Sequence, residues 1–343
     1  MIQNYFHADQ VAPFVQWQSW AHNYLIITHI SPDGDAIGAS LAMMHYLRSK
    51  NNNVTVMVPN DFPDYFLKID GAEEIEVFNE SVSQLDIINH ADVIICLDFN
   101  DVSRIGALNF HIIDAYCNKI MIDHHLNPQK FCDLVLSVPQ ASSTCELVYH
   151  FLCAIGSHKN IDRKVAQSIY LGMMTDTGCF SYNSNNPDIF SIVSDLLSCG
   201  VDKDYIYRTV NYSYSADRMR LMGYALCISM QFYRDGQVAL IALADKDMKR
   251  FNYQPGDTEG FVNLPLQILG VKMSVLIRED KELHKQKISA RSVGDIPCNE
   301  FMAKFFNGGG HKNAAGGELE GTLAHAVKVF EKSIEDWELQ NNC

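Results

Sequence analysis

The sequence contains ten cysteines in 343 residues but no C-x-x-C pair. The cysteines are scattered from Cys96 to Cys343, which fits reduced, mostly buried thiols better than a disulfide framework or a zinc knuckle. Long apolar runs are missing too, and none approaches the roughly 20 residues that span a bilayer. Residues 1–20 lack the basic region of a signal peptide. These absences predict a cytoplasmic protein without a membrane partner.

Positive charge is also scarce. Lysine and arginine number 27 against 41 aspartates and glutamates, so the formal net charge is −14. Nonspecific binding of long nucleic acid depends on neutralising many phosphates, and long DNA is therefore not an expected partner. A short phosphorylated ligand stays compatible, because metal ions and a local basic patch can receive it. The length favours two domains.

The first half of the chain alternates short β-rich runs with helical patterns, which is typical of βαβ units and a parallel sheet. The expected strands are residues 24–28, 54–58, 91–97 and 119–122, and the expected helices are residues 36–50, 143–155, 163–174 and 188–198. Ligands of such sheets bind beyond the carboxyl ends of the strands.

The pattern changes in the second half. Residues 205–230 look helical, and beyond them strand pairs are expected at 230–233 with 237–243 and at 272–278 with 286–292, followed by helices at 299–306 and 322–339. The sequence thus predicts an α/β protein in three parts. An N-terminal parallel-sheet domain (1–204) is followed by a helical connector (205–230) and a smaller α/β domain with a mixed sheet (231–343).

Acidic and imidazole side chains gather where the expected elements end. The clusters are His29-Ile-Ser-Pro-Asp33-Gly-Asp35, Asp98, Asp123-His124-His125 and, at the end of a helix, Asp176. One such cluster alone would most simply be a solvated turn, but four in one chain predict a common site. Carboxylates with a few imidazoles suit Mn²⁺ or Mg²⁺, whereas thiolate-rich sites suit zinc.

The pair Asp33 and Asp35 indicates more than one metal ion. In an extended segment both carboxylates point to one side, and they would repel each other unless cations lie between them. Two ions ~3.5–4 Å apart serve in-line displacement at phosphorus. One of the two acids also suits the N-cap of the helix from Ala36, and both roles can hold at once.

These four motifs resemble those of the DHH phosphoesterase superfamily. The run Gly308-Gly309-Gly310-His311-x-x-Ala314-Ala315-Gly316 is similar to the glycine-rich signature of the DHHA1 domain. In family order, the motifs resemble stand-alone DHH–DHHA1 proteins of the oligoribonuclease and pAp-phosphatase (nano-RNase) type, also labelled RecJ-like or exopolyphosphatase-related. The resemblance implies a DHH domain followed by a DHHA1 domain.

The resemblance also implies sites for two divalent ions, with manganese as the usual metal and magnesium as the alternative. One ion would be held by His29, Asp33 and Asp98, and the other by Asp35, Asp98, His124 and Asp176, so that Asp98 bridges them. His125 would face the phosphate and stabilise its developing charge, while Asp123 would orient neighbouring ligands.

On the substrate side, the resemblance places Arg291 and His311 at the nucleotide distal to the scissile phosphate. Gly308, Gly309 and Gly310 would allow close backbone approach, although alone they would most simply form a flexible turn. Arg104 has two possible roles that the sequence does not separate: it contacts the substrate, or it anchors its own loop. Ser142-Ser143-Thr144 is predicted first as an N-cap.

The favoured function is a phosphodiesterase that releases mononucleotides from very short RNA, such as dinucleotides and linear pNpN, with pAp phosphatase activity alongside. One alternative is a cyclic-dinucleotide (c-di-AMP) phosphodiesterase. An alternative of another class is a catalytically inactive nucleotide-binding protein. The sequence leaves cleavage polarity, physiological substrate and oligomeric state open, a homodimer included.

Overall fold

The computed structural model describes residues 2–281 and 284–337, and the chain divides into two compact units, residues 1–213 and 214–343. The first unit contains a parallel sheet with the strand order β3-β2-β1-β4-β5-β6. Its strands are β1 (Asn23–Ile27), β2 (Asn53–Val58), β3 (Glu76–Val77), β4 (Val93–Leu97), β5 (Asn118–Asp123) and β6 (Leu134–Ser137). The expected α/β class with an N-terminal parallel sheet is therefore confirmed.

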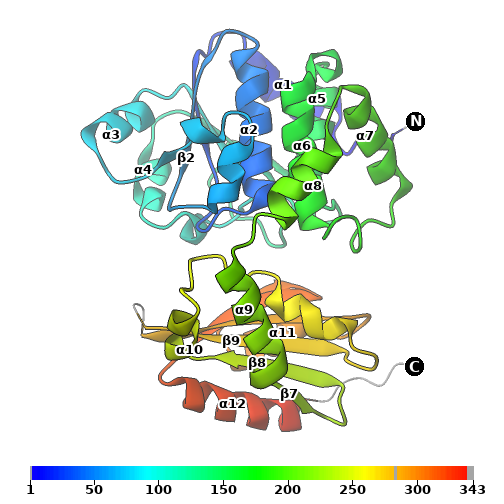
Figure 1. Ribbon diagram of the computed structural model, residues 1–343. Helices are drawn as coiled ribbons and strands as arrows, with labels where there is room; N and C mark the ends of the chain where they lie inside the picture. The colour runs from blue at the N-terminus through cyan, green and yellow to red at the C-terminus, as the bar shows by residue number, and fades with distance from the viewer. Residues whose placement is uncertain (1, 282–283, 338–343) are drawn as a thin grey trace. The chain divides into compact units, whose positions relative to one another are not determined.

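Helices cover both faces of this sheet (Figure 1). They are α1 (Ala8–Trp17), α2 (Gly34–Arg48), α3 (Val82–Asn89), α4 (Leu108–Asp114), α5 (Thr144–Ala154), α6 (Arg163–Asp176), α7 (Pro187–Ser198) and α8 (Lys203–Asn211). Along β1, Ile26 packs into the core with α2, α5 and α6, whereas Leu25 and Ile27 pack into the core with α3 and α4. Burial on both faces explains why these strands are continuous apolar runs.

The strand order reverses between β1 and β4, since β2 and β3 lie on one side of β1 and β4 to β6 on the other. In parallel α/β sheets such a switch point opens a crevice beyond the carboxyl ends of the two strands. The clusters after β1, β4 and β5 all emerge at this edge.

Glycines allow helices α2 and α6 to pack closely. A Cβ on Gly38 would lie 2.5 Å from the carbonyl oxygen of Ser168 on α6, and a Cβ on Gly172 would lie 2.5 Å from Oδ1 of Asp35 on α2. Both distances are far below van der Waals contact, so each position admits only glycine without a shift of its neighbours. The close approach brings the end of α6 beside the start of α2, where Asp176 and Asp35 lie.

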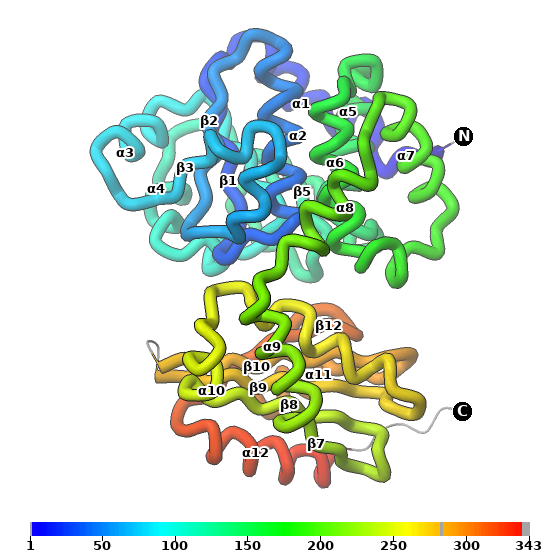
Figure 2. Tube along the Cα trace, viewed as in Figure 1, coloured from blue at the N-terminus to red at the C-terminus, as the bar shows by residue number. Residues whose placement is uncertain are grey.

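The second unit contains a mixed sheet with the order β11-β12-β10-β9-β8-β7; in Figure 2 the labels β12, β10, β9, β8 and β7 follow in that order. Its strands are β7 (Met230–Tyr233), β8 (Val238–Leu243), β9 (Met273–Asp280), β10 (Lys285–Ser292), β11 (Gly309–His311) and β12 (Ala314–Glu320). Strands β8 and β9 are parallel, and the other pairs are antiparallel. The predicted mixed sheet is confirmed.

Two separate cores flank this second sheet. Helices α11 (Cys298–Phe305) and α12 (Leu323–Asp336) share one core, and α9 (Ala216–Tyr224) and α10 (Asp245–Arg250) share the other. Short 3-10 turns occupy Asp64–Lys68, Ala72–Glu74, Val102–Ile105, His158–Asn160 and Phe261–Gln267. Among the described residues, no helix is long and apolar enough to cross a membrane.

Residues 205–230, expected to be helical, form two helices and a π-helical turn. Helix α8 ends at Asn211 and α9 begins only at Ala216, because Ser215 caps the new helix by accepting the N–H of Arg218. A π-helical turn, Ala225–Ser229, then leads into β7. The division between the two units falls inside this segment, and the expected connector stays a prediction. The expected final helix ends at Asp336, and residues 338–339 lie outside the described residues.

Arg234 caps the carboxyl end of α12 from the β7–β8 turn. Its guanidinium donates to the carbonyl oxygens of Ile334, Glu335 and Trp337, at 2.9, 2.9 and 2.7 Å. Hydrogen bonds of charged groups contribute about 1.5–3 kcal/mol. Arg234→Met, which keeps the aliphatic stem, is therefore expected to speed hydrogen exchange in residues 323–336 about tenfold or more, measured by mass spectrometry. Arg220→Met, which breaks only an exposed ion pair, is expected to change it little; equal exchange in both variants would contradict the capping role.

Candidate metal centre

Asp98 is the central carboxylate of the predicted site and follows β4 directly. It is 2% exposed and adopts a left-handed backbone conformation, with φ +63°, which few residues other than glycine, asparagine and aspartate tolerate. Its Oδ2 lies 3.2 Å from Nε2 of His29, and its Oδ1 accepts the hydroxyl of Thr144 at 2.9 Å. The strained turn places the carboxylate among these neighbours.

The first group of potential ligands contains His29, Asp33 and Asp98. One ligand atom from each residue lies within 4.8 Å of the others. Nδ1 of His29 lies 2.8 Å from the carbonyl oxygen of Ile30, so Nδ1 carries a proton, and Nε2, which faces Asp98, is the atom that would present a lone pair to a metal ion after losing its own proton. Asp33 is the N-cap of α2, because its side chain accepts the N–H groups of Asp35 and Ala36. The capping role expected for one of the two acids thus falls on Asp33.

The second group contains Asp35, His124 and Asp176, again with ligand atoms within 4.8 Å. Nε2 of His124 lies 3.5 Å from Asp176, 3.7 Å from Asp98 and 4.0 Å from Asp35. Its Nδ1 faces the carbonyl oxygen of Ala141 at 3.3 Å. Because Nδ1 of His124 is directed at this carbonyl oxygen, Nε2 is the ring atom that faces the carboxylates.

The amino end of α5 holds Asp35. The N–H of Thr144 donates to its Oδ2 at 2.6 Å, and the N–H of Cys145 donates to its Oδ1 at 2.9 Å. Two N–H groups at a helix start favour a carboxylate. Each oxygen still has a second lone pair, so these bonds leave Asp35 able to bind a metal ion.

The pKa shifts show that the cluster holds more negative charge than its own cations balance. Burial, together with the charges of Asp98 and Asp176, raises the pKa of Asp35 well above its ordinary value. Burial lowers the pKa of His124, but the carboxylates of Asp176, Asp98 and Asp35 outweigh it and raise that pKa to about 9. The pKa of Asp98 is lowered, because the hydrogen bond and charge of His29 outweigh burial. Hard oxygen donors with imidazoles in a buried, acidic cluster fit divalent cations.

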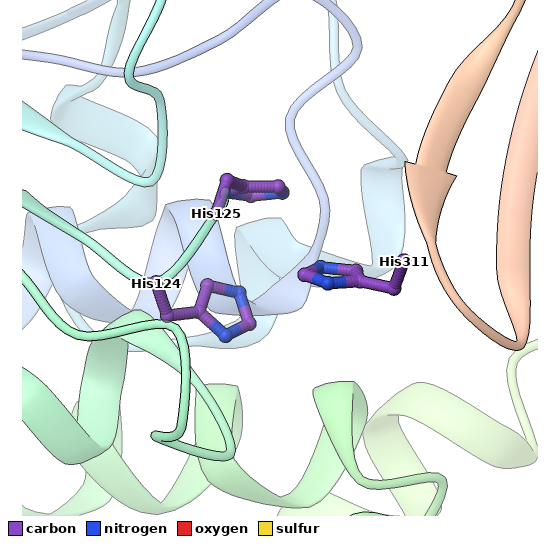
Figure 3. A group of neighbouring side chains, drawn as sticks. All are labelled: His124, His125 and His311. Atoms are coloured by element: carbon purple, nitrogen blue, oxygen red, sulfur yellow. The ribbon is translucent and has the colours of Figure 1, made fainter. Parts of the chain in front are cut away.

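His125 and Asp123 form a pair beside these groups, and with Asp98 they offer a further set of ligand atoms within 4.8 Å of one another. Nδ1 of His125 donates to Oδ1 of Asp123 at 2.7 Å, and the N–H of His125 donates to Oδ2 at 2.7 Å. Asp123 is fully buried, whereas the side chain of His125 is 24% exposed. Figure 3 shows the rings of His124 and His125, which are inclined at 71° with centroids 4.8 Å apart. Asp123 thus fixes the ring of His125 while Nε2 points away from it.

Arg104 lies in the loop that contacts the backbone of the His29 segment. Its carbonyl oxygen accepts the N–H of Ile30 at 2.7 Å, and its positive charge contributes a lowering to the pKa of His29, which remains raised overall. The bond from Ile30 involves only the backbone of Arg104, so both roles expected for its side chain, loop anchor and substrate contact, stay predictions.

The other predicted substrate residues lie together within the second unit. Arg291 on β10 pairs with Ala314 on β12, and Ala314 pairs with His311 on β11. Paired residues of antiparallel strands project from the same face, so Arg291 and His311 belong to one cross-strand row. His311 is the third residue labelled in Figure 3. The glycine run forms the β11 edge rather than a flexible turn, and a Cβ on Gly308 would lie 2.1 Å from the carbonyl oxygen of Gly316.

Sequence reasoning predicted the start of α5 but missed its contacts with the acidic cluster. Ser143 is the N-cap, as expected, and accepts the N–H of Glu146 at 3.0 Å. The contacts of Thr144 and Cys145 with the carboxylates were not anticipated. A Ser-Ser-Thr run before an apolar helix signals a cap equally well anywhere in a protein, so no local signal distinguished this one.

Comparison with known proteins matches both halves of the chain. The model for the DHH family, N-terminal domain, matches residues 23–173, and the model for the DHHA1 domain matches residues 235–337. The crystal structure of an exopolyphosphatase-related protein from Bacteroides fragilis is 47% identical, covers 97% of this chain and 98% of that chain, and superposes with a TM-score of 0.92.

Two curated relatives are more distant. The bifunctional oligoribonuclease and PAP phosphatase NrnA of Thermus thermophilus is 27% identical over 86% of this chain and 84% of that protein. The cyclic-di-AMP phosphodiesterase PdeA of Listeria monocytogenes is 27% identical over 90% of this chain, which spans only 47% of that protein.

Proposed function

The chain belongs to the DHH–DHHA1 phosphoesterases and is a hydrolase, and from that premise we propose that it cleaves very short oligonucleotides to mononucleotides with two divalent ions. A second proposed activity is removal of a phosphate from 3′,5′-bisphosphate nucleosides such as pAp. Support comes from the similarity to NrnA, whose name carries both activities. The observation that carries the proposal is the position of Asp98 between two groups of ligand atoms, with His29 at one of its oxygens and His124 near the other.

In this proposal His29, Asp33 and Asp98 hold one ion, and Asp35, Asp98, His124 and Asp176 hold the other. Two such ions supply Lewis-acid stabilisation at phosphorus and an acidified water. The carboxylates and imidazoles are pre-oriented for this task by the backbone contacts of His29, Asp35 and His124. We favour manganese over magnesium because two of the donors are imidazoles, whereas Mg²⁺ prefers oxygen ligands and water.

His125 is proposed to contact the phosphate. Asp123 accepts the Nδ1 proton of His125 and holds the ring in one orientation, so that Nε2 is directed to the substrate. A positioned donor at developing negative charge is a strong catalytic element. In the second unit, Arg291 and His311 are proposed to bind the nucleotide, with the backbone of Gly308–Gly310 close to a phosphate. Arg104 is proposed as a further phosphate contact.

Metal removal is expected to abolish hydrolysis of pApA, and added Mn²⁺ is expected to restore it. The residues that surround the reacting phosphate are mostly anionic, so the cations are needed to admit the substrate as well as to activate water. The measurement follows AMP release from pApA, from longer RNA and from pAp after chelation and reconstitution. Unchanged turnover in chelator would contradict the proposal, and preference for longer RNA would contradict the substrate class.

A cyclic-dinucleotide phosphodiesterase is the second candidate, and the similarity to PdeA supports it. The same assay with cyclic di-AMP separates the two, because a linear-substrate enzyme is expected to leave the cyclic compound largely intact. A catalytically inactive nucleotide-binding protein would leave bis-(p-nitrophenyl) phosphate uncleaved at any metal concentration.

We also propose a cytoplasmic location, which agrees with the nine free cysteines of the described residues.

A further inference from the structure

Thr144 makes hydrogen bonds to one carboxylate of each proposed metal-binding group. Its hydroxyl donates to Oδ1 of Asp98 at 2.9 Å, and its N–H donates to Oδ2 of Asp35 at 2.6 Å. All three residues are buried, at 0%, 2% and 1% exposure. Thr144 lies at the first position of α5, after the N-cap Ser143.

We propose that Thr144 is a positioning residue for hydrolysis, one that fixes how Asp98 is shared between the two ions. The inference rests on the proposed two-ion function. A bridging carboxylate has to present one oxygen to each ion, and the carboxylate of Asp98 could otherwise turn about its side-chain torsion. The hydroxyl of Thr144 occupies one lone pair of Oδ1, while His29 lies at Oδ2. The plane of the carboxylate is therefore set before any ion binds.

The start of α5 is itself held in place. Ser143 accepts the N–H of Glu146, and Oε2 of Glu146 accepts the N–H and the hydroxyl of Ser142, both at 2.6 Å. Glu146 is fully buried, so these bonds face no competition from bulk water. Thr144 lies inside this closed set of bonds and can move little relative to the helix. An outer partner that is rigid in this way transmits its orientation to the ligand.

A purely structural role for Thr144 would predict something different. The hydroxyl would then serve only to satisfy a buried carboxylate oxygen, and its loss would lower stability without changing how the folded protein binds Mn²⁺. Metal affinity and the division of any effect between kcat and KM separate the two roles, because neither is set by the free energy of unfolding.

The decisive comparison is Thr144→Val with Thr144→Ser in the full-length protein. Valine keeps the branched shape and the backbone N–H but removes the hydroxyl, whereas serine keeps both donors. Calorimetric titration of the metal-free protein with Mn²⁺ is expected to show about 10–100-fold weaker binding for Val, with kcat for pApA reduced about tenfold and KM little changed. The Ser variant is expected within about threefold of the parent protein. Thr209→Val, a buried threonine of α8, is the matched control.

The outcomes are distinguishable. Parent-like Mn²⁺ binding and kcat in a folded Val variant overturn the positioning role, and so does an equal loss in Val and Ser. Thr144→Ala, which adds no methyl group in place of the hydroxyl, repeats the comparison if circular dichroism shows that Val misfolds. If the parent protein itself binds no Mn²⁺, the proposed function fails and the positioning role fails with it. If the parent protein depends on the metal but the Val variant binds Mn²⁺ and turns over as the parent does, the positioning role alone fails.

Discussion

The Asp98→Asn variant is expected to lose bound divalent metal and phosphodiester hydrolysis together. Asparagine tolerates the left-handed backbone that Asp98 adopts, at φ +63°, so the substitution removes the charge without forcing the turn to rearrange. It removes the negative charge that both proposed ions share and replaces one of the two ligating oxygens by an amide nitrogen, which does not bind them. Changing an outer partner of a metal ligand typically reduces affinity or activity about 10–100-fold, and loss of the shared ligand is expected to exceed that, by at least about 10³-fold in turnover.

The measurements are Mn²⁺ content by elemental analysis and AMP release from pApA at saturating substrate. Asp86→Asn is the control, because Asp86 is an exposed carboxylate on α3 and its loss is expected to leave both quantities unchanged. An Asp98→Asn protein that keeps two bound ions would show that the two ligand groups are independent of each other. A protein that keeps its ions but not its turnover would assign Asp98 to the reaction rather than to metal binding.

His125→Ala is expected to reduce turnover about 10²–10³-fold while the metal content stays at the parent value. The physical reason is that His125 is held by Asp123 through two hydrogen bonds and belongs to neither of the two groups assigned to the ions. Loss of its ring removes a donor to the phosphate and leaves the proposed ligands intact. Mn²⁺ content and AMP release from pApA are measured as for Asp98→Asn. The Asp98 variant is expected to lose both, whereas the His125 variant is expected to lose only turnover.

Two further variants sharpen this expectation. His90→Ala removes an exposed imidazole on the surface and is expected to behave as the parent protein. Asp123→Asn keeps the ring but changes its partner, because an amide can present an N–H as well as an oxygen to Nδ1, and it is expected to reduce turnover less than removal of the ring. Normal turnover in His125→Ala would show that the phosphate is held by other residues.

Much of the first unit could be predicted from the sequence because its signals are local. The strands are buried on both faces, so β1, β4 and β5 each contain an apolar run, and the acidic or imidazole residues of one motif lie at the end of each run. The edge strands β3 and β6 were missed because they are short and only partly buried. The α8–α9 break was missed because Ser215 looks like an ordinary helical residue until its side chain is seen to cap a new helix.

The sequence predicted which residues form the site but not how their side chains are oriented. The sequence contains the acids and histidines, and their family order is visible. It does not show that the backbone of Asp98 adopts the left-handed conformation, or that the carbonyl oxygen of Ala141 lies beside Nδ1 of His124. Nor does it show that Thr144 contacts two carboxylates. These features depend on how segments far apart in the chain meet, and the backbone groups that take part carry no residue-specific signal.

The close contact of α2 and α6 restricts how this enzyme can vary. At Gly38 the obstacle is a backbone carbonyl oxygen, which no change of side chain removes, and at Gly172 it includes the carboxylate of Asp35 at 2.5 Å. Helix α2 has no exposed residue, and α6 exposes only Arg163 and Lys164 at its start, so neither glycine can be replaced without moving buried neighbours. Attempts to stabilise the protein by replacing helical glycines with alanine, a common strategy, are expected to damage the reaction centre here rather than strengthen the fold.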